Sequence, residues 1–168
     1  SELVRQVMRF QPLAVGLLEV SELNLFQIEM ELRQIDEKPS VQAFLADIRD
    51  RAAVDRAFKE FQPNVVFHAA AYKHVPMQEA FPWEAVQNNI AGTRNLVEAS
   101  IASGIERFVL VSTDKAVRPT NVMGATKRVA ELLVSCRNGT GPVRFMAVRF
   151  GNVMGSSGSA IPIFRDQI

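Results

Sequence analysis

Short apolar runs alternate along the chain with longer segments in which apolar residues recur at helical spacing. The short runs predict β-strands at 13–19, 41–45, 65–67, 107–112 and 143–149. The longer segments predict a first helix that begins at Ser1 and ends before Pro12, and further helices at 25–32, 54–61, 83–101 and 125–136. Strands that alternate with helices favour βαβ units and a parallel sheet covered on both faces. The fold class is therefore α/β, a doubly wound parallel sheet of the Rossmann type.

The last two helices are predicted from apolar residues that recur at helical spacing. These positions are Trp83, Val86, Ile90, Val97 and Ile101 in one helix, and Ala125, Val129, Leu132 and Cys136 in the other. Residues that could bind a ligand or take part in a reaction follow the predicted strands, at Glu19, Asp47, 69–74, 112–115 and 150–159. Ligands of open α/β sheets bind at the carboxyl ends of strands, so these residues are the candidates for a functional site.

No strand is predicted before the first helix, which begins at Ser1. A dinucleotide-binding sheet has its central strand and a glycine-rich phosphate turn at that place. We therefore expect residues 1–168 to be a fragment of one Rossmann-like dinucleotide-binding domain, with a gap between two half-sheets. Most of a C-terminal substrate domain is expected to lie outside these residues.

Composition narrows the class of protein. The 19 basic and 18 acidic residues give a net charge of +1, which does not favour binding to nucleic acid. The 48% hydrophobic and 22% charged residues are typical of a globular domain. No apolar run in residues 1–168 is long enough to be predicted as a membrane span, and no segment of these residues is predicted to be a signal peptide. One cysteine and two histidines provide neither a disulfide framework nor a zinc ligand set, so no metal site is expected.

The strongest chemical signal is the pair of segments 112–116 and 123–127. Thr113, Asp114 and Lys115 follow a predicted buried strand, and Met123 and Lys127 lie one helical turn apart. Hydride-transfer enzymes of the short-chain type have a tyrosine and a lysine at that spacing. Methionine cannot transfer a proton. Taken alone, the methionine is typical of a core residue and the Thr-Asp-Lys triplet of a solvated turn.

Four segments resemble one family. They are HAAAYKHVPMQE (68–79), NNIAGTRN (88–95), STDKAVRPTNVMGATKRVAE (112–131) and RFGNVMGSSGSAIPIF (149–164). They are similar to the bacterial UDP-N-acetylglucosamine 4,6-dehydratases, extended short-chain dehydrogenases of the CapD-like polysaccharide biosynthesis family. Methionine at position 123 resembles the larger, membrane-anchored members that retain the C5 configuration. The resemblance implies a cytoplasmic domain, with an inner-membrane anchor and a homo-oligomer expected of the parent protein.

This resemblance implies a reaction on a UDP-sugar with NAD or NADP as the cofactor. The sugar is oxidised at C4, water is lost across C5 and C6, and hydride returns to C6. Asp114 is the implied acid for the departing hydroxyl, Lys115 the base at C5, and Thr113 the residue that binds O4. Three candidates remain for taking the O4 proton: Asp114, Lys127 and a water molecule held by Thr113.

The resemblance also implies the binding residues. The cofactor is expected to contact Ala69, Ala70, Ala71, Lys73, Asn89 and Lys127. Asp47 and Ile48 are expected at the adenine, and Glu19 at the ribose 2′-hydroxyl, where an acid favours NAD over NADP. Asn89 is further expected to tie neighbouring loops together. The substrate is expected to contact His74, Met77, Asn152, Ser156 and Ser157.

Two other functions compete with the dehydratase. A nucleotide-sugar C4-epimerase would have tyrosine at position 123 and no acid–base pair at 114–115. A catalytically inactive dinucleotide-binding module is supported by Met123 and by the absence of a glycine-rich turn before Ser1. A mass loss of one water molecule from UDP-N-acetylglucosamine would separate the dehydratase from both.

Overall fold

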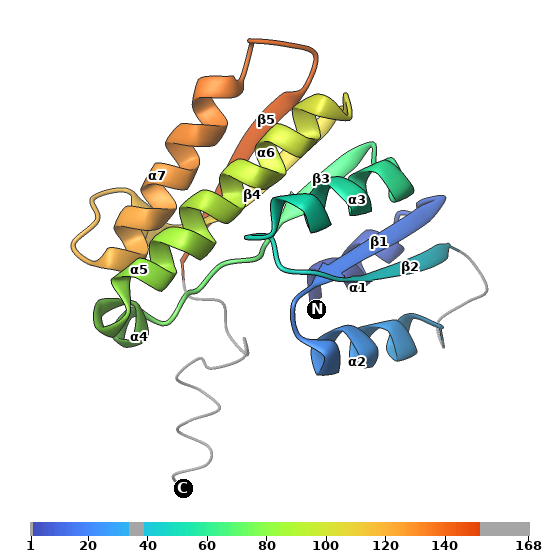
Figure 1. The fold of residues 1–168 in the computed structure, drawn as a ribbon, viewed down its shortest axis with the longest axis horizontal. Helices are drawn as coiled ribbons and strands as arrows, with labels where there is room; N and C mark the ends of the chain where they lie inside the picture. The colour runs from blue at the N-terminus through green and yellow to red at the C-terminus, as the bar shows by residue number, and fades with distance from the viewer. Residues whose placement is uncertain (1, 34–38, 152–168) are drawn as a thin grey trace, which may run out of the picture.

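Five parallel strands form two sheets in the computed structural model, which describes residues 2–33 and 39–151 (Figure 1). β1 (Ala14–Glu19) pairs with β2 (Ser40–Leu45). The second sheet has the order β3 (Val65–His68), β4 (Arg107–Thr113) and β5 (Arg144–Phe150). The predicted α/β class is confirmed, and the described strands divide into two groups as expected.

Two helices accompany the first sheet. α1 (Glu2–Met8) and α2 (Glu22–Arg33) share a small core with β1, built from Met8, Leu17, Leu25 and Leu32.

No helix in residues 2–33 or 39–151 is long and apolar enough to cross a membrane.

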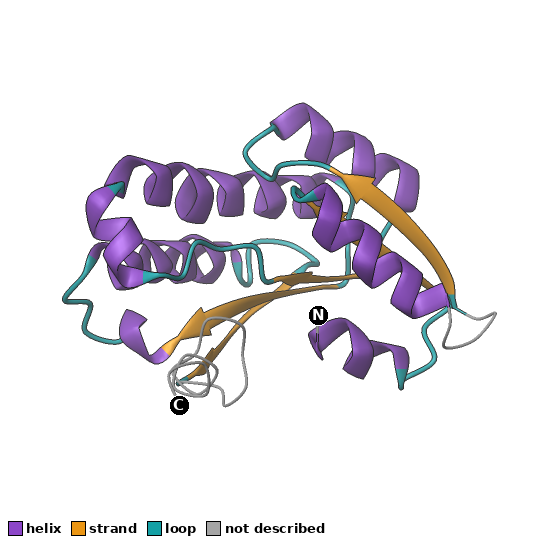
Figure 2. Ribbon diagram, turned by 90° about the horizontal axis from the view of Figure 1, so that it is seen from below, coloured by secondary structure: helices purple, strands orange, loops and turns teal. Residues whose placement is uncertain are grey.

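Three helices form the larger core on the second sheet. α3 (Arg51–Phe61), α6 (Thr93–Ala102) and α7 (Val122–Arg137) contribute buried residues that include Val54, Phe58, Leu96, Val97, Ala130 and Val134. Within the described residues these helices lie on one side of the sheet (Figure 2). The opposite side carries half-exposed Phe67, Met146, Val148 and Phe150, so the expected covering of both faces is seen on only one face here.

The helix predicted at 83–101 is interrupted. Its path consists of α5 (Pro82–Ala85), a π-helix η1 (Val86–Gly92) and α6, preceded by the short α4 (Val75–Ala80). π-Helical turns inside α-helices are frequent at functional sites. Gly92, at the end of η1, lies so close to Ile48 that an added Cβ would be 2.5 Å from its side chain.

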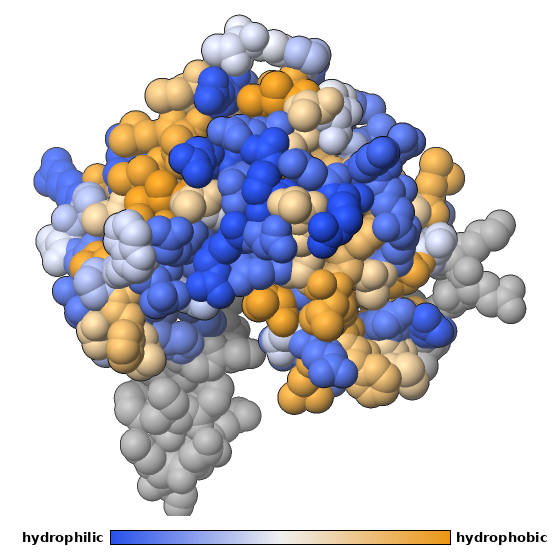
Figure 3. Space-filling model, viewed as in Figure 1, coloured by the Kyte–Doolittle hydropathy of each residue, from blue (hydrophilic) through white to orange (hydrophobic). Residues whose placement is uncertain are grey.

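α7 is confirmed as a helix, but the apolar positions from which it was predicted do not form its buried face. Val129 and Leu132 are 38% and 47% exposed, and Cys136 is exposed. The buried face instead carries Met123, Thr126, Lys127, Ala130, Glu131 and Val134. Figure 3 shows hydrophobic side chains gathered over α7, whereas α6 presents mainly hydrophilic ones. Two polar residues of the buried face, Thr126 and Glu131, bond to neighbouring elements.

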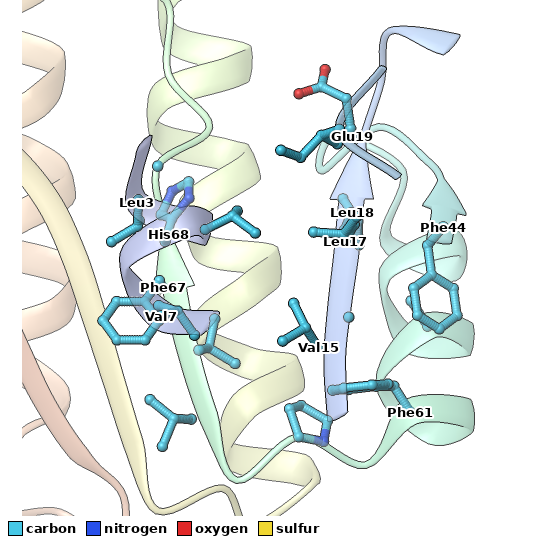
Figure 4. Close-up of a pocket in the computed structure, with 18 of the residues that line it drawn as sticks. Leu3, Val7, Val15, Leu17, Leu18, Glu19, Phe44, Phe61, Phe67 and His68 are labelled. Atoms are coloured by element: carbon cyan, nitrogen blue, oxygen red, sulfur yellow. The ribbon is translucent and has the colours of Figure 1, made fainter. Parts of the chain in front are cut away.

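A cavity of about 950 Å³ lies between β1 and β3 (Figure 4). Residues 14–19 line one side and residues 65–70 the other. Most of the lining is apolar, with Glu19 and His68 near the carboxyl ends of the two strands. This cavity corresponds to the expected gap between the half-sheets.

Candidate functional site

Every described strand ends at a residue that the sequence singled out. Glu19 ends β1, Asp47 follows β2, and Ala69 follows β3. Thr113 ends β4, and residue 151 follows β5. Because the strands are parallel within each sheet, these residues lie at the carboxyl edges, where ligands of such sheets bind.

Thr113, Asp114 and Lys115 form one hydrogen-bonded turn. Thr113 Oγ1 donates to Asp114 Oδ1 at 3.0 Å and accepts from the Lys115 backbone N–H at 3.4 Å. Lys115 Nζ lies 3.1 Å from the same Asp114 Oδ1. The Lys115 hydrogen bond, reinforced by that of Thr113, lowers the pKa of the exposed Asp114. Asp114 is therefore a carboxylate, paired with the Lys115 side chain, when no substrate covers it.

The first turn of α7 packs directly on this turn, which continues as the short helix η2 (Asp114–Ala116). Asn121 caps α7 by accepting the Gly124 N–H at 2.7 Å. A Cβ added at Gly124 would lie 2.5 Å from the Lys115 carbonyl oxygen, so only glycine permits this approach. The two motif segments that stand apart in the sequence are thus in contact through Gly124 and Lys115.

Lys127 is a buried amine. It is 5% exposed, and burial lowers its pKa to about 8, although the nearby Glu131 carboxylate partly offsets this effect. Met123, one turn earlier, is also buried at 5% exposure. An amine with such a pKa changes its protonation state within the range in which enzymes work, which is characteristic of functional sites.

Asn89 ties the loop after β3 to α7. Its Oδ1 accepts the Tyr72 N–H at 2.8 Å, and its Nδ2 donates to the Tyr72 carbonyl at 3.1 Å. The same Nδ2 donates to Thr126 Oγ1 at 3.0 Å. The side chain thus makes the loop-tying contacts expected of it, while its contact with a cofactor stays a prediction.

His68, the last residue of β3, is a packed histidine that is 2% exposed. Burial lowers its pKa to about 3, so the imidazole is neutral. Its Nε2 lies 2.8 Å from Thr93 Oγ1, and that hydroxyl donates to the Asn89 carbonyl at 2.7 Å. Thr93 must therefore accept from His68, which assigns the proton to Nε2.

The predicted adenine and ribose residues lie near the first sheet. Glu19 Oε1 accepts the Ser21 N–H at 3.0 Å, and Glu19 shares the cavity with Ala69 and Ala70. Asp47 accepts from the backbone N–H of Arg49 at 2.8 Å and from its guanidinium, whose hydrogen bond lowers the pKa of Asp47. Ile48 is buried in the core at 4% exposure. Contact of these residues with a nucleotide stays a prediction.

The remaining predicted residues are placed as follows. Ala71 and Lys73 lie in the loop after β3, His74 is the N-cap residue of α4, and Met77 is 54% exposed on α4. Asn152, Ser156 and Ser157 lie outside the described residues. The cavity between β1 and β3 does not reach Asp114, Lys115 or Lys127.

Sequence reasoning missed two residues that organise the site. The role of Gly124 could not be predicted, because only the folded structure shows which atoms a side chain at that position would contact. Glu131 is 3% exposed and bonds to both β4 and β5. A charged residue one turn after Lys127 could have indicated a polar buried face, but the apolar stripe on the other side of α7 masked it.

Comparison with known proteins gives related sequences over the whole chain. The chain is 50% identical to the probable polysaccharide biosynthesis protein EpsC of Bacillus subtilis over 169 residues, which is all of this chain and 28% of EpsC. It is 35% identical to a UDP-N-acetylglucosamine 4,6-dehydratase (inverting) of Campylobacter jejuni, over 95% of this chain and 47% of that protein. It is 36% identical to a UDP-glucose 4-epimerase of Rickettsia rickettsii, over 89% of this chain and 46% of that protein. The chain thus spans less than half the length of these relatives.

Solved structures share the fold. The X-ray structure of Pen from Bacillus thuringiensis matches with a TM-score of 0.90 and 39% identity, over 99% of this chain and 51% of Pen. A UDP-glucose 4-epimerase of Thermus thermophilus, solved in complex with NAD, matches with a TM-score of 0.70 and 25% identity, over 87% of this chain and 57% of that one. A family model described as polysaccharide biosynthesis protein matches residues 1–168. This chain therefore belongs to the polysaccharide biosynthesis protein family, as its motifs indicate.

Proposed function

We propose that this domain is part of an NAD(P)-dependent 4,6-dehydratase that acts on UDP-N-acetylglucosamine for surface polysaccharide biosynthesis. The observation that carries the proposal is the Asp114–Lys115 pair at the end of β4, packed on the helix that carries Lys127. Similarity to the Campylobacter dehydratase supports the reaction, and similarity to EpsC supports the biological setting.

The residues at the strand ends fit a nicotinamide dinucleotide. Ala69, Ala70 and Ala71 leave room for a close approach of the cofactor, and the Lys127 ammonium can donate to ribose hydroxyls. The Glu19 carboxylate suits a ribose 2′-hydroxyl and repels a 2′-phosphate, which favours NAD over NADP. When bound, the nicotinamide accepts a hydride from sugar C4 and later returns it to C6.

Elimination of water needs a neutral base and a protonated acid at the same time. The Asp114–Lys115 pair reaches that state by moving one proton along its 3.1 Å contact, from Lys115 Nζ to Asp114 Oδ1. A bound sugar that excludes water would favour the neutral form, because desolvation penalises both charges. The pair is exposed at present, so a substrate can cover it.

The proton balance of the elimination follows from this state. Lys115 takes the C5 proton, the C5–H electrons form the C5–C6 double bond, and the C6–O bond breaks. Asp114 gives its proton to the departing hydroxyl, which leaves as water, and the pair returns to carboxylate and ammonium. Lys115 then returns a proton to C5 as hydride reaches C6. The proton released from O4 balances the one that Asp114 gives away.

The test uses the complete polypeptide that the gene encodes, with UDP-N-acetylglucosamine in deuterated water. A dehydratase gives a product lighter by one water molecule, with deuterium at C5. Lys115→Met is expected to lower turnover by about 1000-fold, because it removes the base, and Asp114→Asn by about 100-fold. Cofactor binding, measured by fluorescence titration, should survive both changes.

Each competing function predicts a different result. A C4-epimerase would give UDP-N-acetylgalactosamine with unchanged mass and no deuterium at C5. An inactive binding module would bind the cofactor without converting the sugar. Either result with the unaltered protein would overturn the proposal, as would Lys115→Met with normal turnover.

A further inference from the structure

The buried face of α7 contains one carboxylate that the proposed reaction does not use. Glu131 lies one turn after Lys127, and its side chain is 4% exposed. A charge with so little access to water is tolerated only when partners compensate for the lost hydration. Its partners therefore show what it does.

Glu131 binds groups from three places in the fold. Ser112 Oγ on β4 donates to its Oε1 at 2.6 Å. Arg149 on β5 binds both oxygens, with Nε 2.8 Å from Oε1 and Nη2 2.6 Å from Oε2. Arg128 on α7 adds a bond to Oε2 at 3.1 Å. A bidentate arginine and a hydroxyl together hold the carboxylate in one orientation.

The strand register explains why both β-strand partners reach the same group. Ser112 and Arg149 are paired residues of the parallel strands β4 and β5. Their side chains lie on the same face of the sheet, the face on which α7 packs. Glu131 thus fastens the ends of two strands to one point on the helix.

The contacts of Glu131 lie next to the proposed catalytic groups. Ser112 is followed directly by Thr113, Asp114 and Lys115, and Glu131 follows Lys127 by four residues. The Ser112–Glu131 bond therefore connects the strand end just before the acid–base turn to α7 one helical turn after Lys127. Gly124 makes the second connection, on the other side of the turn.

We propose that Glu131 is a positioning residue, which fixes the Asp114–Lys115 turn relative to Lys127 by holding Ser112 and Arg149. The inference rests on the proposed function, and Glu131 itself touches neither sugar nor cofactor in it. Hydrogen bonding from Arg149 lowers the pKa of Glu131 to about 2, so the carboxylate keeps its charge at working pH.

The experiment separates position from charge. Glu131→Asp keeps the charge but withdraws the carboxylate by one methylene, and Ser112→Ala removes only one hydrogen bond. In the complete polypeptide we expect both to lower kcat, Glu131→Asp by about 100-fold, since misplacements near 1 Å have effects of that size. KM for the sugar should change little. Glu98→Gln is the control, because it alters an exposed Glu–Arg pair away from the site, in which Arg51 and Glu98 are 41% and 38% exposed.

Hydrogen exchange gives a readout that does not depend on the reaction. In Glu131→Asp the backbone amides of residues 113–117 should exchange faster than in the unaltered protein, whereas Glu98→Gln should leave them unchanged. Normal kcat and normal exchange in folded Glu131→Asp would overturn the inference. If the unaltered protein forms no keto sugar, the proposed function fails, and exchange alone then decides whether Glu131 positions the turn.

Discussion

At the residue scale, the protonation of Lys127 connects burial to cofactor binding. Burial lowers its pKa to about 8, so the amine loses its charge as the pH rises through that value. The charged group that acts on it is Glu131 on its own helix, which favours the ammonium. His68 on β3 is neutral at working pH. An ammonium donates strong hydrogen bonds to ribose hydroxyls, and the neutral amine donates weaker ones.

Cofactor affinity should therefore fall with rising pH above the Lys127 pKa. We expect a loss of about 10-fold from about pH 8 to pH 9.5, measured as the dissociation constant by fluorescence titration. Lys127→Met, which carries no charge, should bind weakly and equally at both values. A pH-dependent affinity that survives in Lys127→Met would assign the effect to another group.

At the element scale, the contact between α7 and the turn after β4 depends on the missing side chain of Gly124. Gly124→Ala would improve the intrinsic helix propensity, but its Cβ would meet the Lys115 carbonyl oxygen at 2.5 Å. The turn has to move, and we expect kcat to fall by about 10-fold or more. Gly141→Ala is the matched control, because nothing lies within 4 Å of its added Cβ. Equal kcat in the two variants would contradict this account.

The same two elements show what sequence patterns can and cannot predict. Strand and helix positions, including β4 and α7, follow from local periodicity, and so do the residues at the strand ends. The orientation of α7 cannot be predicted from local periodicity, because a helix with apolar residues on two sides has two faces that could be buried. Thr126 and Glu131 lie inside because partners on η1, β4 and β5 bond to them, and those partners are distant in the sequence.

At the scale of the whole molecule, buried ionisable groups connect the site to acid stability. The folded protein keeps His68 neutral down to about pH 3, whereas the unfolded chain takes up a proton near 6.5. It keeps Glu131 ionised down to about pH 2, whereas the unfolded chain takes up a proton near 4.5. In both cases the unfolded state binds more protons, so the free energy of unfolding falls as the pH falls.

Stability should therefore decline in two steps, from pH 6.5 through His68 and further from pH 4.5 through Glu131. His68→Gln can still donate to Thr93 but cannot titrate, so it should remove the first step, which is on the order of a few kcal/mol. The measurement is urea unfolding at a series of pH values. His74→Gln, which alters the exposed second histidine, should keep both steps. If His68→Gln unfolds with the original pH dependence, the buried imidazole is not the group that links acid to unfolding.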